Sequence, residues 1–129
     1  MKIYLKGKCN NDCIFCDIDK KRDTLFSQVE KKIEKASERG DKRVVFTGAE
    51  PTFREDILDL IGLAKKKKID IIQLNTNGRL LADKKFTEKI IKAGANYFKI
   101  SLHAILQNCT IIFPEGETVL IKQLEGLRI

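Results

Sequence analysis

The sequence lacks the features of membrane and exported proteins. No apolar stretch approaches the ~20 residues that a helix needs to cross a bilayer. Residues 1–6 lack the long apolar region and the small-residue cleavage site of a signal peptide. We therefore expect a cytoplasmic protein with no membrane partner. In that compartment clustered cysteines are more typical of metal or redox chemistry than of disulfides.

Signals of disorder and of nucleic-acid binding are also weak. The chain has 129 residues, 43% hydrophobic and 33% charged, which is ordinary for one soluble globular domain. Its net charge of +7 gathers in short basic runs that lie in different predicted elements and contain no interleaved aromatic residues. Such runs are typical of solvated helix faces, so we do not expect a nucleic-acid interface. A preference for anionic substrates or partners stays open.

Predicted strands and helices alternate along most of the chain. The expected strands are 2–7, 43–47, 69–75 and 96–102. Capping boxes at Ser27 and Thr52 and a cap at Asp83 mark the expected helix starts, and leucines at 120, 124 and 127 predict a final helix over about 117–128. This order predicts an α/β fold with a parallel sheet, right-handed crossovers and helices on the outer face.

Polar or metal-binding residues follow each predicted strand. The cysteines come after the first strand, Gly-Ala-Glu-Pro at 48–51 after the second and Asn-Thr-Asn-Gly at 75–78 after the third, while Ser101 and His103 end the fourth. Because the carboxyl ends of parallel strands meet at one edge of the sheet, these tips predict a single shared site.

Three cysteines, Cys9, Cys13 and Cys16, form a C-x3-C-x2-C array. Three thiolates in one loop suit a soft metal or an iron–sulfur cluster, and a cubane cluster with three protein ligands keeps one iron open. The alternative is a structural zinc ion with His103 or Cys109 as the fourth ligand. Zinc usually takes two close pairs of ligands, which this array matches poorly.

On these motifs the sequence resembles the radical S-adenosylmethionine (radical SAM) superfamily, over residues 1 to about 103. The cysteine array after a first strand is the most specific part, whereas the tetrapeptide at 48–51 is weak alone and has Ala49 where glycine is usual. The resemblance implies a partial TIM-like barrel, a (βα)4 fragment of the family's (βα)6 core. We expect a single domain over 1–129 with its cluster loop at 8–20.

The resemblance implies a role for each motif. Cys9, Cys13 and Cys16 would ligate three irons of a [4Fe–4S] cluster, and SAM would chelate the fourth. Other SAM contacts would come from Phe15 beside the adenine, Gly48, Ala49, Glu50 and Pro51 at the methionine amino group, Asn75 and Asn77 along the barrel, and Ser101 at the carboxylate or ribose. Four of these residues have a simpler interpretation: a core aromatic for Phe15, turn residues for Glu50 and Asn77, and a small buried residue for Ser101.

The implied chemistry is reductive. The reduced cluster would cleave SAM, and the resulting 5′-deoxyadenosyl radical would abstract hydrogen from a substrate that the sequence does not identify. A low-potential electron donor of the flavodoxin or ferredoxin type would be needed. Two alternatives stay open: a non-catalytic iron–sulfur or SAM-binding module completed by a partner chain, and a zinc-stabilised interaction protein.

With four units against the family's six, the chain as given would leave the edge of its fourth strand open, and open edges are pairing hazards. A homodimer, a partner chain or the segment 104–116, which is more apolar than a loop should be, could cover that edge. The sequence assigns no role to His103 or Cys109.

Overall fold

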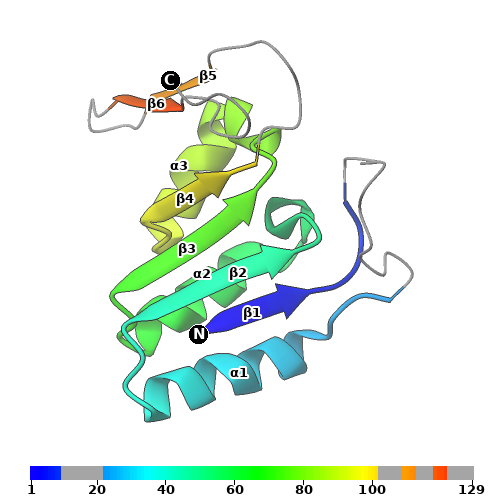
Figure 1. The fold of residues 1–129 in the computed structure, drawn as a ribbon, viewed down its shortest axis with the longest axis vertical. Helices are drawn as coiled ribbons and strands as arrows, with labels where there is room; N and C mark the ends of the chain where they lie inside the picture. The colour runs from blue at the N-terminus through cyan, green and yellow to red at the C-terminus, as the bar shows by residue number, and fades with distance from the viewer. Residues whose placement is uncertain (10–21, 102–108, 113–117, 122–129) are drawn as a thin grey trace.

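The computed structural model contains a four-stranded parallel sheet (Figure 1). It describes residues 1–9, 22–101, 109–112 and 118–121, the last two stretches as backbone. The strands are β1 (Lys2–Leu5), β2 (Arg43–Gly48), β3 (Ile71–Thr76) and β4 (Tyr97–Ile100), and they pair in chain order. All three pairings are parallel. The predicted α/β class and parallel sheet are confirmed.

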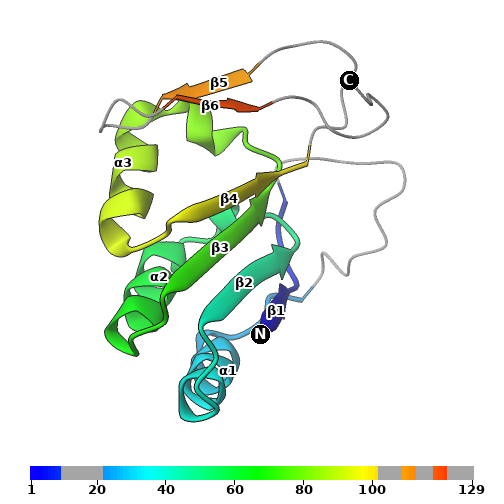
Figure 2. The same cartoon turned by 60° about the vertical axis from the view of Figure 1, so that its left-hand side comes forward.

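Three α-helices connect the parallel strands and cover one face of the sheet (Figure 2). They are α1 (Phe26–Glu38), α2 (Ile57–Lys66) and α3 (Lys84–Ala93), and two 3-10 turns, η1 (Pro51–Phe53) and η2 (Leu80–Ala82), precede α2 and α3. In the described ranges no helix is long and apolar enough to cross a membrane.

The hydrophobic core lies between the sheet and these helices. Alternate residues along a strand point to opposite faces, and the alternate apolar residues of β1 to β3 are fully buried against the helices. The strands contribute Ile3, Leu5, Val44, Phe46, Ile72 and Leu74, and the helices contribute Val29, Ile33, Ile57, Leu60, Ile61, Ala64 and Ile90. The opposite residues of each strand therefore form a second face that the described helices leave uncovered.

Two of the three predicted helix starts are wrong in detail. Helix α1 begins one residue before Ser27, and the Gln28 side chain accepts a hydrogen bond from the Leu25 N–H at 3.2 Å. Thr52 lies in η1 rather than at the start of α2, because the carboxylate two residues earlier accepts its N–H. The predicted cap Asp83 is confirmed: its carboxylate accepts from the N–H groups of Lys85 and Phe86 at 2.9 and 3.3 Å.

The described chain after β4 contains an antiparallel hairpin. Strands β5 (Cys109–Ile112) and β6 (Thr118–Ile121) form a separate two-stranded sheet. The predicted helix over 117–128 is therefore wrong at 118–121. Three of those four residues, Thr118, Val119 and Ile121, are β-branched and favour a strand opposite another β-rich segment, which outweighs the leucine spacing. The rest of that predicted helix lies outside the described residues.

Candidate functional site

Hydrogen bonds join the carboxyl ends of the four parallel strands into one edge. The Ala49 N–H donates to the Leu5 carbonyl oxygen at 2.8 Å, which ties the end of β2 to the end of β1. The Ser101 N–H donates to the Thr76 carbonyl oxygen at 2.9 Å, which does the same for β4 and β3. Residues that the sequence places after separate strands are thus neighbours along this edge.

Gly48 allows β1 and β2 to approach closely at this edge. Its φ is +111°, and a Cβ atom added there would lie 2.2 Å from the Leu5 carbonyl oxygen. Only glycine accepts both the positive φ and the close contact without strain. Gly48 is therefore needed for the close contact between β1 and β2.

Glu50 is a buried carboxylate, 3% exposed, at the start of the turn after β2. Its Oε1 accepts hydrogen bonds from the Thr52 N–H at 3.2 Å, from the Thr52 hydroxyl at 2.5 Å and from the Thr76 hydroxyl. Its Oε2 accepts from the Asn77 N–H at 2.7 Å. A buried carboxylate is stable only when such donors replace water. Glu50 thereby joins the turn after β2 to the turn after β3.

Asn75 lies on the uncovered face of the sheet, in a short polar network. Its Nδ2 donates to the Thr47 hydroxyl at 3.2 Å, and its Oδ1 accepts from the Gln73 side chain at 2.7 Å. Gln73 is buried and Asn75 half-buried. This network orients the Asn75 amide on the face that would line the barrel.

Cys9 lies four residues beyond β1 and is half-buried at the same edge. Cys13, Phe15, Cys16 and His103 lie outside the described residues. The donor set fits an iron–sulfur cluster, since Cys9 begins a loop with two further thiolates and that loop starts at the edge where Gly48 to Pro51 lie. Cys9, Cys13 and Cys16 would hold the cluster.

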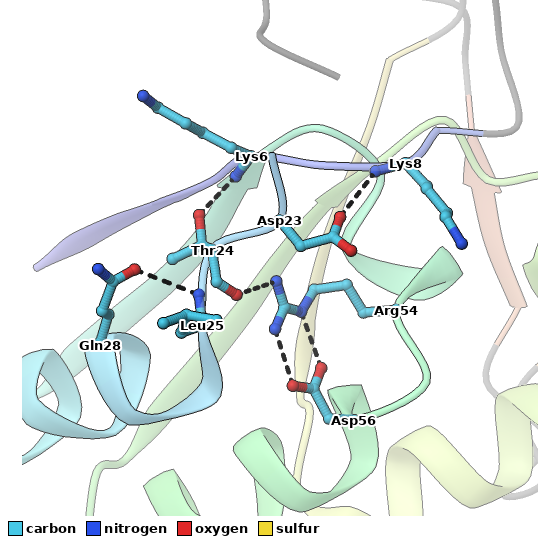
Figure 3. Close-up of polar contacts among 8 residues, drawn as sticks. All are labelled: Lys6, Lys8, Asp23, Thr24, Leu25, Gln28, Arg54 and Asp56. Atoms are coloured by element: carbon cyan, nitrogen blue, oxygen red, sulfur yellow. Dashed lines mark hydrogen bonds and ion pairs between the residues drawn. The ribbon is translucent and has the colours of Figure 1, made fainter. Parts of the chain in front are cut away.

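Hydrogen bonds close the base of the loop that contains the cysteines (Figure 3). The Lys6 N–H donates to the Thr24 hydroxyl at 2.8 Å, and the Thr24 N–H donates to the Lys6 carbonyl oxygen at 3.2 Å. The Lys8 N–H donates to Asp23 Oδ1 at 3.3 Å. We call these two contacting segments, residues 6–8 and 23–24, the clasp. It holds both ends of the cysteine loop together.

The structure adds four residues to the predicted site. Thr52, expected only as a helix cap, and Thr76 bind the Glu50 carboxylate, and Gln73 and Thr47 orient Asn75. Thr76 lies between two asparagines of the predicted site, and that position is a signal in the sequence. The other partners become recognisable only once the register of the strands is known.

Comparisons with known proteins match these observations. The radical SAM superfamily matches the chain over residues 3–115. A protein of Sulfolobus acidocaldarius named "Probable GTP 3',8-cyclase" is 35% identical over 98% of this chain and 41% of its own length. Proteins of the same name from Thermococcus kodakarensis and Methanocaldococcus jannaschii are 34% and 31% identical, each over 81% of this chain.

The chain spans less than half the length of these curated relatives, 41%, 35% and 36% respectively. The superfamily match nevertheless runs from within β1 to beyond β4 and includes each of the strand ends described above. Enzymes of this superfamily use a [4Fe–4S] cluster and SAM. The chain belongs to the radical SAM superfamily.

Proposed function

We propose that this chain holds a [4Fe–4S] cluster through Cys9, Cys13 and Cys16, binds SAM at the edge formed by the four strand ends, and forms the cofactor site of a radical SAM enzyme. The observation that supports this most directly is the continuous hydrogen-bonded edge. Its bonds join the end of β1, the turn at Gly48 to Pro51, the turn after β3 and the end of β4, and Cys9 follows β1 by four residues. When bound, the cofactors supply a one-electron cleavage of SAM and a 5′-deoxyadenosyl radical that abstracts hydrogen from substrate.

The residues of this chain would bind SAM and orient it. Since the Glu50 carboxylate already accepts four hydrogen bonds from Thr52, Thr76 and Asn77, we propose that backbone carbonyls of the turn at 48–51 supply much of the contact to the methionine amino group. Asn75 and Ser101 would contact the cofactor from β3 and β4. Phe15 would pack beside the adenine.

We propose a nucleoside triphosphate as the substrate class. The relatives' name contains GTP. Lys99 is an exposed basic side chain on the face that would line the barrel, and it is paired with Asn75 near the carboxyl ends of β3 and β4. A cation at this end of the sheet favours an anionic substrate.

Turnover would need a low-potential electron donor, of flavodoxin or ferredoxin type, and a reducing compartment such as the cytoplasm. In the described part of the chain no strand pairs with the outer edge of β4. We propose that a further chain, either a second copy or a partner, covers this edge in the working enzyme, because an open parallel edge invites unspecific pairing.

Anaerobic reconstitution with iron and sulfide, followed by electron paramagnetic resonance of the reduced protein with and without SAM, tests the proposal. We expect a [4Fe–4S]⁺ signal whose shape changes when SAM is added, and 5′-deoxyadenosine in the reaction mixture. A changed signal without 5′-deoxyadenosine would favour the non-catalytic SAM-binding module. Zinc in place of iron would contradict the proposal altogether.

A further inference from the structure

Arg54 connects the clasp to the segment that follows Glu50 (Figure 3). Its Nη1 donates to the Thr24 carbonyl oxygen at 2.9 Å. Its Nε and Nη2 donate to Asp56 Oδ1 and Oδ2 at 2.8 and 2.7 Å, so the guanidinium and the carboxylate form a bidentate pair. The Arg54 side chain is only 13% exposed. These bonds fix one guanidinium between two parts of the proposed site.

Asp56 is committed to this pairing. It occupies the position before α2 where an aspartate normally accepts a backbone N–H of the first helical turn, yet it makes no such side-chain bond. Both of its oxygens bind Arg54 instead. The Asp56 carboxylate therefore orients the Arg54 guanidinium instead of capping α2. This arrangement indicates that the position of the guanidinium is important to the structure.

The clasp makes the Thr24 carbonyl a useful anchor. Thr24 is joined to Lys6 in both directions, and Gly7 lies so close to Asp23 that an added Cβ would be 2.0 Å from Asp23 Oδ1. The two ends of the cysteine loop thus behave as one unit. A bond from Arg54 to Thr24 fixes that whole unit to the segment 51–56.

We propose that Arg54 is a positioning residue that sets the base of the cysteine loop against the turn at Gly48 to Pro51, the two parts of the chain that would hold the cluster and SAM. This inference rests on the proposed function. Arginine is required rather than lysine, because only its planar fork can bind both carboxylate oxygens and a carbonyl at once. Cluster formation itself depends on the three thiolates and is independent of Arg54.

The test uses Arg54→Met and Arg54→Lys, with Arg39→Met as the matched control. Arg39 is also two residues before an aspartate: its Nη2 lies 3.3 Å from Asp41 Oδ2, but its side chain is 64% exposed and it precedes β2 rather than following it. For each variant we would measure iron and sulfide content, SAM affinity of the reconstituted protein by equilibrium dialysis, and amide hydrogen exchange of the apo protein.

We expect Arg54→Met to keep its cluster while its SAM affinity falls about tenfold, as loss of a charged hydrogen-bonded group implies. The SAM affinity of Arg54→Lys should lie between those of Arg54→Met and the wild type, and the SAM affinity of Arg39→Met should equal that of the wild type. In the apo protein the amides of Lys6 and Thr24 should exchange faster in Arg54→Met, while that of Val45, bonded to the Met1 carbonyl, should be unchanged.

Three results would overturn the proposal. Equal SAM affinity in Arg54→Met and Arg39→Met would show that Arg54 positions nothing. Faster exchange at Val45 as well would make Arg54 a general stabiliser of the fold. If the wild-type protein itself failed to respond to SAM, the proposed function would fail, and the apo exchange data would then decide: unchanged Lys6 and Thr24 amides in Arg54→Met would overturn the positioning role too.

Discussion

The Asn77 backbone N–H donates a 2.7 Å hydrogen bond to Glu50 Oε2, so a side chain at the end of β2 holds the turn that follows β3. The other oxygen of the same carboxylate binds the hydroxyl of Thr76. Two turns whose joined residues are 27 positions apart in sequence therefore share one buried carboxyl group. This group fixes the two turns against each other at the rim of the sheet.

Glu50→Gln should destabilise the apo protein by about 1–3 kcal/mol, because an amide cannot accept at both ends and its NH2 group would face another donor. Urea unfolding of the wild type and variant measures this difference. Glu55→Gln is the matched control, since Glu55 is exposed on the same segment and should change the free energy of unfolding little. Equal effects of the two substitutions would contradict the role of Glu50 as a bridge between the two turns.

A substitution cycle tests whether Glu50 and Thr76 act together. Thr76→Val removes the hydroxyl that donates to Glu50 but keeps the shape of the side chain. We expect a coupling energy of about 0.5–3 kcal/mol between Thr76→Val and Glu50→Gln. Thr87→Val supplies the control, because this equally buried threonine donates to the Leu81 carbonyl at 2.9 Å instead. The destabilisation caused by Thr87→Val should simply add to that of Glu50→Gln. If the destabilisation caused by Thr76→Val were also additive with that of Glu50→Gln, the coupling would be refuted.

Alanine substitutions at two glycines should change the stability of the protein in opposite directions. Gly48→Ala should lower the free energy of unfolding by about 2–4 kcal/mol, since it combines a positive φ with a Cβ 2.2 Å from the Leu5 carbonyl oxygen. Gly62→Ala should stabilise by about 0.5–1 kcal/mol, because Gly62 lies within α2 and nothing lies within 4 Å of an added Cβ. Thermal unfolding of both variants measures the two signs. A neutral Gly48→Ala would mean that β1 and β2 can separate at this edge.

Much of the fold follows from local pattern. Strands such as Arg43–Gly48 are short apolar runs bounded by turn residues, and Asp83 and Gly94 bound their helix as capping rules require. The parallel order follows from the alternation of strands and helices. The polar residues that follow the strands can therefore be placed on one edge from the amino-acid sequence alone.

The errors arise where tertiary contacts override local signals. Thr52 reads as a helix cap by spacing, but the Glu50 carboxylate takes its N–H and its hydroxyl, and α2 then begins later. Leu120 fits a helical stripe, yet it is paired with Thr110 of β5, as its neighbours are paired with other residues of β5. The role of Arg54 could not be predicted, because its acceptor, the Thr24 carbonyl, is 30 residues away in sequence.

Substitutions among the four cysteines of the chain distinguish an iron–sulfur cluster from a zinc site. A cluster held by the loop needs Cys9, Cys13 and Cys16, whereas a tetrahedral zinc site built on cysteine alone would also need Cys109. After anaerobic reconstitution, Cys9→Ala should lose most of its iron and sulfide, while Cys109→Ala should keep the wild-type amounts. Circular dichroism should report unchanged helix content in both variants, because the described core residues against which α1, α2 and α3 pack come mainly from those helices and from β1 to β3. Equal metal loss from both variants, with zinc in the wild-type protein, would contradict the cluster assignment, since only a four-thiolate site depends on both residues.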